Sequence, residues 1–209
     1  MRGKFITFEG CEGVGKSAQV RMLGAWLSER GASFTVTREP GGSGICEAIR
    51  KVILDPAFSD MDDSCELLLY LAARAQHLKD VIIPALAEGK LVVCDRYMDS
   101  TLAYQGFAKG MGVERVRRLN ALTAGDYIPD LTVFLDYPPD KAFMRKGGAD
   151  KSDRLENLDK SFHMRVYEGY KLLAEEEPQR IVSVDASGTK FETHAKIIEL
   201  LSERGFIVG

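Results

Sequence analysis

The stretch KFITFEGCEGVGKS (residues 4–17) joins an apolar run to a helical pattern through a loop that is rich in glycine. Gly10, Gly15, Lys16 and Ser17 match GxxxxGK[ST], with a strand pattern before and a helical pattern after, which is the context that this motif requires. Glycines let successive backbone N–H groups turn inward, and the start of the following helix adds its positive end. The stretch therefore predicts a phosphate-binding loop made of Gly10, Cys11, Glu12, Gly13, Val14, Gly15, Lys16, Ser17 and Ala18.

Two side chains at the end of this loop indicate which phosphate compound it binds. We expect Lys16 to reach the β and γ phosphates as a point charge, and the Ser17 hydroxyl to ligate Mg²⁺, which prefers oxygen ligands. Asp95, at the tip of the run LVVCD, is expected to orient the same magnesium from a neighbouring strand; the alternative for Asp95 is a helix N-cap. The predicted ligand is a nucleoside triphosphate with magnesium.

Short apolar runs and longer helical patterns alternate along the chain. Each run ends in a charged residue, as expected of strands covered on both faces; the runs are 4–9, 33–38, 91–95, 131–136 and 180–185. Helical periodicity follows in longer segments, including 17–30 and 65–88. This order predicts an α/β fold with an open parallel five-stranded sheet and helices on both faces. A chain of 209 residues without a Pro- or Ser-rich linker is expected to form one domain over 1–209.

The segment KGGADKS (residues 146–152) differs from the rest of the chain because it is rich in small and charged residues. It lies between Arg145 and Arg154, with helical patterns on both sides. Such a composition is typical of an exposed loop that can move. We therefore expect a mobile lid at about 145–154.

Composition and charge limit the cellular location that we expect for the protein and the partners that it can bind. The formal net charge of −3 carries no signature of binding to nucleic acid, and no apolar run is long enough to span a membrane or to serve as a secretory signal. We expect a cytoplasmic protein with no nucleic-acid or membrane partner. The cysteines lie in apolar or glycine-rich settings without a CxxC pair, so buried reduced thiols are expected at Cys11, Cys46, Cys65 and Cys94.

Several arginines are expected near the phosphate loop. Arg38 and Arg96 stand at the ends of two predicted strands, and ligands of open parallel sheets bind outside those ends. Arg50 and Arg74 add positive charge on the helices that follow. One triphosphate held by Lys16, Mg²⁺ and a helix end does not need so many guanidinium groups, so the cluster favours a second anionic ligand. The alternative is that each arginine pairs with a carboxylate.

Five motifs along the chain carry a resemblance to a known family. The motifs FEGCEGVGKS (8–17), TREPGG (37–42), AARAQH (72–77), DRYMDSTLAYQG (95–106) and DRLE (153–156) together resemble the bacterial type of thymidylate kinase, a nucleoside monophosphate kinase-like member of the P-loop NTPases. The resemblance implies transfer of the γ-phosphoryl group of ATP to thymidine 5′-monophosphate (dTMP). One alternative is a kinase for another nucleoside monophosphate or a deoxynucleoside. A nucleotide-dependent switch is the alternative from another class, although the chain lacks the guanine-reading patterns NKxD and TKxD.

The same resemblance implies roles for individual residues of the acceptor site. It implies that Arg96, Arg50 and Arg38 hold the phosphate of dTMP. Glu12 matches the acid that contacts the sugar 3′-hydroxyl, and Tyr104 matches the tyrosine that crowds the 2′ position. The base is implied to stack on Tyr70 and to be read by three hydrogen-bonding residues, Arg74, Thr101 and Gln105. The resemblance also implies homodimers, with the helix at 65–88 as a candidate contact.

Some positions differ from the family pattern. Gly13 stands where eukaryotic-type enzymes place a catalytic arginine, so the missing charge must come from the lid. The lid holds Gly147-Gly148-Ala149 where relatives have more arginines. Among its cations Arg145, Lys146, Lys151 and Arg154, we expect Arg145 to reach the transferring group and Arg154 to anchor the lid. The expected catalytic residues are therefore Lys16, Arg96, Arg145 and Glu12. Ser43, Tyr70 and Thr101 are milder departures, because ring and hydroxyl are kept.

Overall fold

A parallel sheet forms the centre of the protein, whose computed structural model describes residues 2–147 and 153–207. The strand order is β2-β3-β1-β4-β5. The strands are β1 (Phe5–Glu9), β2 (Phe34–Arg38), β3 (Leu91–Asp95), β4 (Leu131–Asp136) and β5 (Ile181–Asp185). The predicted α/β fold with five parallel strands is confirmed, and each strand lies within one residue of its predicted bounds.

The register of the sheet gathers the strand ends that carry the chemistry. Phe8 of β1 is opposite Asp95 of β3, and Asp95 is in turn opposite Arg38 of β2. The phosphate loop begins at Gly10, directly after β1. The loop, Asp95 and Arg38 therefore meet at the carboxyl edge of the sheet, where ligands of open parallel sheets bind.

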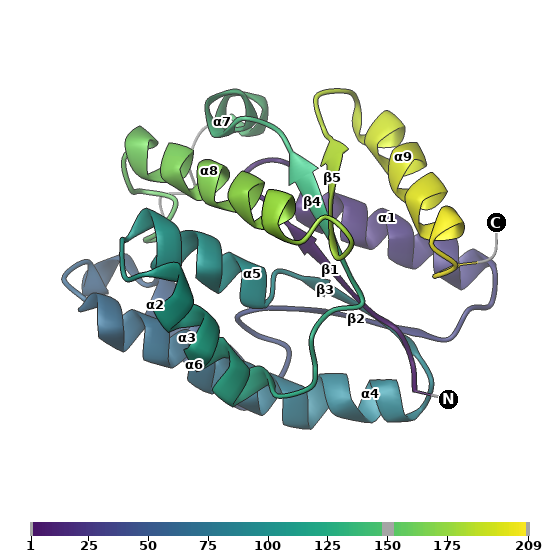
Figure 1. The fold of residues 1–209 in the computed structure, drawn as a ribbon, viewed down its shortest axis with the longest axis horizontal. Helices are drawn as coiled ribbons and strands as arrows, with labels where there is room; N and C mark the ends of the chain where they lie inside the picture. The colour runs from purple at the N-terminus through teal and green to yellow at the C-terminus, as the bar shows by residue number, and fades with distance from the viewer. Residues whose placement is uncertain (1, 148–152, 208–209) are drawn as a thin grey trace.

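Alternate side chains of the strands enter two different packing layers. Ile6 and Val93 belong to the same hydrophobic cluster as Leu23 of α1 (Lys16–Glu29). Phe5 and Val92 lie in a second cluster, with helical residues 78–86. Figure 1 shows α1 and α9 (Lys190–Glu203) on one side of the strands and α4 (Ile83–Ala87) on the other. Period-two alternation between two apolar layers explains why the strands read as continuous hydrophobic runs.

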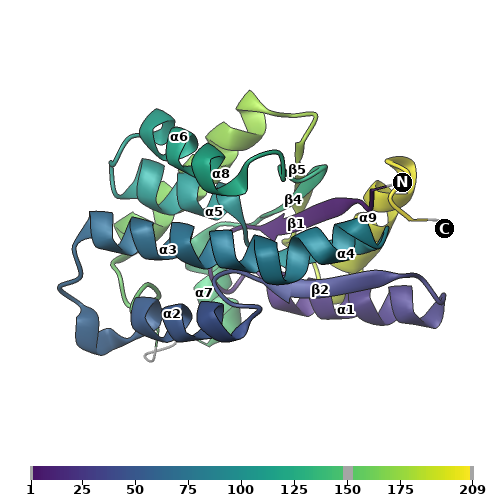
Figure 2. The ribbon, with the colours of Figure 1, turned by 90° about the horizontal axis from the view of Figure 1, so that it is seen from below.

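The helices between the strands supply the walls of the site. The long segment predicted at 65–88 is one continuous rod made of α3 (Asp63–His77), the π-helical turn η2 (Leu78–Ile82) and α4, as Figure 2 shows. The other elements are α2 (Gly44–Leu54), η1 (Pro56–Phe58), α5 (Met98–Thr101), the π-helical η3 (Leu102–Ala108), α6 (Val113–Ala124), α7 (Pro139–Lys146) and α8 (Lys160–Glu176).

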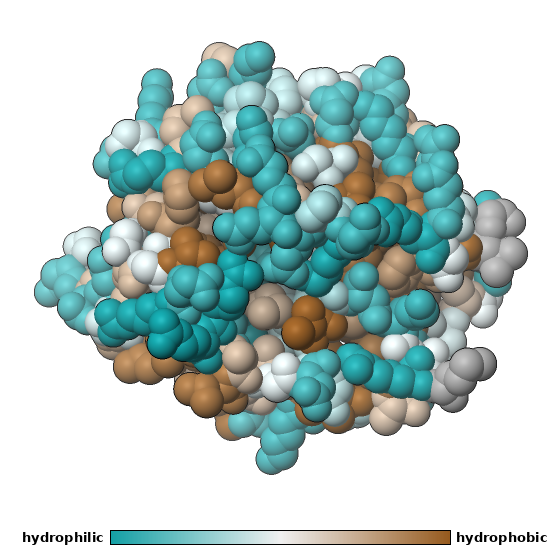
Figure 3. Space-filling view, in the orientation of Figure 1, coloured by the Kyte–Doolittle hydropathy of each residue, from teal (hydrophilic) through white to brown (hydrophobic). Residues whose placement is uncertain are grey.

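Hydrophilic residues cover most of the face seen in Figure 3, with apolar residues in separate patches. Among the described residues, no helix has the length and apolarity needed to cross a membrane. All four cysteines are free thiols, and three of them are buried. The expectation of a buried thiol is wrong for Cys65, which is exposed in the first turn of α3 on the side away from the core.

Candidate active site

The phosphate loop has a backbone that glycine makes possible. Gly10 has φ 138°, and a Cβ built there would meet the carbonyl oxygen of Leu135 at 2.9 Å. Gly15 has φ 103° and precedes the first residue of α1. L-residues with side chains rarely adopt these angles, so the loop can direct its N–H groups inward only with glycine at these positions.

Lys16 lies inside this loop rather than in solvent. Its Nζ donates to the carbonyl oxygens of Gly10 at 2.9 Å and Cys11 at 2.6 Å. Burial, together with the positive charge of Arg96, lowers the pKa of Lys16 to about 8. The ammonium group is therefore a poorly solvated charge, which an anion would stabilise.

Ser17 and Asp95 join the loop to the end of β3. The Ser17 hydroxyl donates to Asp95 Oδ2 at 2.5 Å. Asp95 therefore faces the loop. The two residues bring a hydroxyl and a carboxylate oxygen together beside Lys16, as the sequence predicts for a magnesium site.

A cleft with a cavity volume of about 380 Å³ opens over these strand ends. Its walls contain all the residues that the sequence predicts for substrate and metal: Ser17, Arg38, Arg50, Tyr70, Arg74, Asp95, Arg96, Thr101, Tyr104 and Gln105. Loop residues Glu12, Gly13, Gly15, Lys16 and Ala18 line the same cleft. The structure thus brings both predicted anion sites into one cavity.

The cleft is lined by equal numbers of basic and acidic side chains. Its basic side chains are Lys16, Arg38, Arg50, Arg74 and Arg96, and its acidic ones are Glu12, Glu39, Asp95, Asp153 and Glu156. The alternative that arginines pair with carboxylates is therefore realised for some of them, within the cleft itself. Binding of an anion here depends on where each guanidinium is held rather than on a large net charge.

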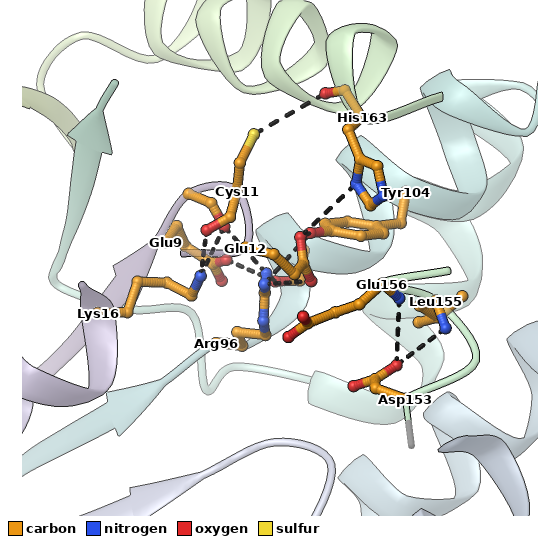
Figure 4. Close-up of polar contacts among 12 residues, drawn as sticks. Glu9, Cys11, Glu12, Lys16, Arg96, Tyr104, Asp153, Leu155, Glu156 and His163 are labelled. Carbon is orange, nitrogen blue, oxygen red and sulfur yellow. Dashed lines mark hydrogen bonds and ion pairs between the residues drawn. The ribbon is translucent and has the colours of Figure 1, made fainter. Parts of the chain in front are cut away.

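Arg96 occupies the centre of the cleft wall with an unusual backbone, because its φ is 69°. Its Nη2 donates to Glu12 Oε1 at 2.7 Å and to the Tyr104 hydroxyl at 3.2 Å, and the Tyr104 hydroxyl donates to the other Glu12 oxygen. Figure 4 shows Glu12 between the loop, Arg96 and Tyr104. Burial alone would raise the pKa of Glu12, but Arg96 and Lys16 lower it, so Glu12 is a carboxylate.

Arg74 forms the buried end of the cleft. Its guanidinium donates to Glu39 at 2.8 Å, to Asn120 at 2.6 Å and to the Thr101 hydroxyl at 2.8 Å. Burial would lower the pKa of Arg74, but Glu39 raises it overall. Arg74 is thus a fixed cation that holds Thr101, a second predicted base contact, in place.

Gln105 and the remaining predicted residues complete the walls. The Gln105 amide donates to Glu66 at 2.8 Å. An amide whose NH₂ is used in this way keeps its carbonyl oxygen as an acceptor. Arg38 pairs with Glu47 at 2.8 Å, and Arg50 donates to the Pro40 carbonyl at 2.8 Å.

Arg145 lies at a second hollow, beside the other edge of the loop. That hollow is lined by Gly13, Val14, Gly15, Ala18, Gln19, Arg145 and residues 187–190, 192 and 193. The Arg145 guanidinium donates to the carbonyls of Ala186 at 2.9 Å and Ser187 at 2.8 Å, and it covers the ring of Tyr137.

Half of the predicted lid, 148–152 with Lys151, lies outside the described residues, as does the side chain of Lys146. The far end of the lid is described and is firmly held. Arg154 donates to the Ile53 carbonyl at 3.0 Å and to Glu66, and its backbone N–H donates to Leu54 O at 2.9 Å. These contacts match the anchoring role expected for Arg154.

Several residues of the site were not predicted from the sequence. Glu39 is buried against Arg74 and His77, and Asp153, Leu155 and Glu156 line the cleft. Their signal was present, because they belong to the motifs TREPGG and DRLE, but the motifs do not say which side chain faces the cavity. His163 is buried beside Phe143, with its Nδ1 4.0 Å from Glu12 Oε2.

Comparisons with known proteins identify relatives of this chain. The family model described as Thymidylate kinase matches residues 8–197. The chain is 46% identical to a thymidylate kinase of Rhizorhabdus wittichii over 205 residues, covering 97% of this chain and 99% of the relative. It is 48% identical over 189 residues to one of Geobacillus thermodenitrificans, covering 90% and 84%. The crystal structure of thymidylate kinase from Ehrlichia chaffeensis superposes with a TM-score of 0.79 at 32% identity, over 97% of this chain and 99% of that chain.

Proposed function

Because this chain belongs to the thymidylate kinase family, we infer that it transfers the γ-phosphoryl group of ATP to dTMP, releasing ADP and dTDP. The observation that carries the assignment is the shared cleft, in which a glycine-built phosphate loop faces a cluster of guanidinium groups. A site for one nucleotide needs only the first of these. The pair provides for a donor and an acceptor in one domain, which we propose spans 1–209.

We propose that the loop holds the β and γ phosphates of ATP. Inward N–H groups and the N-terminus of α1 meet the phosphate oxygens, and Lys16 exchanges its two carbonyl partners for them. Phosphoryl transfer needs mainly positioning and neutralisation of charge on these oxygens. Lys16 is suited to this task because its charge is already desolvated.

Ser17 and Asp95 fit a magnesium ion. They supply a hydroxyl and a carboxylate oxygen within 2.5 Å of each other, and Mg²⁺ prefers oxygen ligands while keeping several waters. We propose that these two residues hold the ion with the phosphates of ATP. When bound, the ion neutralises charge that develops on the β and γ oxygens.

The arginines that line the cleft are proposed to bind dTMP. Arg96, with Arg50 and Arg38 beside it, receives the 5′-phosphate, and Glu12 receives the sugar 3′-hydroxyl. Tyr104 stands next to Glu12, which supports its proposed role in excluding a 2′-hydroxyl.

Thymine would then lie on Tyr70 in the inner part of the cleft. Arg74 and Thr101 offer donors there, and the carbonyl oxygen of Gln105 can accept from the base N3–H. Because Arg74 is locked by Glu39 and Asn120, this end of the site is preorganised.

Arg145 is proposed to supply the lid cation for the transferring group. It already shares a hollow with the loop residues Gly13 and Gly15. To reach the γ phosphate its guanidinium must leave the carbonyls of Ala186 and Ser187.

We also propose a homodimer through α3 and α6, acting in the cytoplasm with no nucleic-acid or membrane partner. Leu68 on α3 is 59% exposed and Leu122 on α6 is 81% exposed, with a shallow hollow between these helices. Apolar side chains on neighbouring helices are suited to cover one another in a symmetric pair. Sedimentation of the wild type and of Leu68→Glu tests this, since only the variant should be a monomer.

The activity is tested by ADP release with a panel of acceptors. With ATP, the protein should release ADP rapidly only when dTMP is added, and slowly with other nucleoside monophosphates or with thymidine. A preference for another acceptor would identify the alternative kinase. Fast ADP release without any acceptor would instead identify a switch or motor.

A further inference from the structure

A buried hydrogen-bonded group lies directly behind the guanidinium of Arg96. Arg96 Nη1 donates to the hydroxyls of Ser100 at 3.1 Å and Tyr170 at 3.2 Å. Both hydroxyls donate to the same oxygen, Oε2 of Glu9, at 2.6 Å and 2.8 Å. Their oxygens are themselves 2.8 Å apart, so the group is compact. Glu9 is 0% exposed and does not line the cleft.

The other oxygen of Glu9 holds the backbone next to Arg96. Oε1 accepts from the N–H of Tyr97 at 2.7 Å. Arg96 has φ 69°, and the left-handed region costs a residue with a side chain about 1–2 kcal/mol. Such a conformation persists only where the surroundings hold it. One carboxylate therefore holds Arg96 from both directions, through the following peptide and beneath the side chain.

The chemistry of a carboxylate also sets the direction of these hydrogen bonds. At pH 8, above the pKa of about 7 to which burial raises Glu9, the carboxylate is mostly ionised and only accepts, so the protons of Ser100 and Tyr170 turn toward it. Their lone pairs then face Arg96 Nη1, which can only donate. A side-chain amide in place of Glu9 would offer an NH₂ group to the hydroxyls and could turn a proton toward the guanidinium.

We propose that Glu9 is a positioning residue for phosphoryl transfer, which acts through Ser100 and Tyr170 to hold Arg96 toward the acceptor phosphate. The inference rests on the proposed function in one respect, namely that Arg96 binds the phosphate of dTMP. Glu9 itself touches neither substrate. Asp99 and Arg96 are the charged neighbours that act on it, and the Tyr170 hydroxyl is the titratable group that bonds to it.

The experiment compares Glu9→Gln with the wild type in steady-state kinetics at pH 8. Glutamine keeps the size of the side chain and an acceptor for the Tyr97 N–H. We expect the KM for dTMP to rise at least about tenfold, as for the loss of one charge-assisted hydrogen bond, and the KM for ATP to stay within about twofold. An unchanged KM for dTMP, or an equal rise for both substrates, would overturn the proposal.

A second variant tests whether Glu9 acts on Arg96 through Tyr170, which we call the relay, or whether the effect comes from a general loss of packing. Tyr170→Phe should raise the KM for dTMP in the same direction but less, because Ser100 remains. In the double variant with Glu9→Gln, the KM for dTMP should be no higher than in Glu9→Gln alone, because Glu9 acts through Tyr170 and its loss already removes the contribution of Tyr170. Effects that multiply would show two independent contributions and overturn the relay.

Two controls complete the test. Thr7 lies on the same strand, is buried, and bonds to Thr132 at 2.9 Å without touching the Arg96 group, so Thr7→Val should leave the KM for dTMP within about twofold. An effect of Thr7→Val equal to that of Glu9→Gln would mean a general response of β1 and overturn the proposal.

Arg96→Lys tests the underlying assignment. If it leaves the KM for dTMP unchanged, the proposed phosphate site fails and the role of Glu9 fails with it. If it raises that KM while Glu9→Gln does not, only the role of Glu9 is wrong.

Discussion

Ser17 and Asp95 are 78 positions apart in the chain, yet their side chains are joined by a hydrogen bond of 2.5 Å. Ser17 lies in the first turn of the helix after the phosphate loop, and Asp95 ends the strand beside it. Parallel pairing of β1 with β3 produces this meeting, because it places the loop and the end of β3 at the same edge. The proposed donor site is therefore a product of sheet topology as much as of the loop.

The pairing predicts a defect in magnesium use when either partner is changed. Asp95→Asn and Ser17→Ala should each raise the Mg²⁺ concentration for half-maximal activity, by at least about tenfold for Asp95→Asn. Titration of ADP release with Mg²⁺ at saturating ATP and dTMP measures this. Asp126→Asn, which removes an exposed carboxylate outside the cleft, is the matched control. A normal magnesium titration for Asp95→Asn would contradict the proposed site.

Lys16→Ala should reduce kcat by about 10²–10³-fold or more, because one preorganised cation near the transferring group is lost. The fold should survive, since the change removes a charge whose burial is unfavourable. Single-turnover kinetics and a thermal melt together check both expectations. A folded variant with a nearly normal rate would show that Lys16 has no catalytic role.

Gln105→Leu should weaken the binding of dTMP far more than the binding of ATP. Leucine has a similar size but leaves the base N3–H without its acceptor, and loss of such a partner costs about 1–3 kcal/mol. We expect the KM for dTMP to rise about 10- to 100-fold, with the KM for ATP nearly constant. Equal changes in the two constants would mean that the acceptor base lies elsewhere in the cleft.

Arg74→Met should mainly reduce stability. The substitution leaves the carboxylate of Glu39 buried with only His77 beside it, and breaking a buried ion pair in this way costs about 3–5 kcal/mol. Urea denaturation measures the loss. Adding Glu39→Gln should recover part of it, because the unpaired charge is removed; a further loss in the double variant would refute this explanation.

The environment of Glu9 predicts that the free energy of unfolding depends on pH. Burial and, next to it, the nearby charge of Asp99 raise the pKa of Glu9 from 4.5 to about 7. Between these two values the folded protein keeps a proton that the unfolded chain has released, so this group makes the free energy of unfolding fall as pH rises. The total is about 3–4 kcal/mol, since one pKa unit corresponds to about 1.4 kcal/mol.

Urea denaturation of the wild type and of Glu9→Gln from pH 4.5 to 8 checks this prediction. Other titrating groups are common to both proteins, so the difference isolates Glu9. The wild type should lose stability relative to Glu9→Gln up to about pH 7, with no further relative change above it. A difference that does not vary with pH would show that Glu9 has an ordinary pKa.

The sequence was sufficient for the parts of the protein that depend on local pattern. The loop at 10–17 and the strands of the sheet were predicted nearly to the residue, because glycine freedom and hydrophobic periodicity act over a few positions. The arginines at the strand ends were predicted as well, since the carboxyl edge of a parallel sheet follows from the order of elements. Cys65 was misplaced because an apolar neighbourhood does not say which face of a helix a residue occupies.

Only the tertiary structure decided how each charge is held. The sequence around Arg74 does not indicate that its partner is Glu39, which lies 35 positions away. In the same way, Glu9 and Tyr170 form a hydrogen bond although 161 positions separate them. Hydrogen bonds between distant polar side chains leave no periodic trace in a chain, because they depend on the packing that brings the elements together. The chain by itself thus determined where the proposed phosphate loop lies, because glycine freedom is local, whereas the packing of α5 and α8, which carry Ser100 and Tyr170, determined how Arg96 is held.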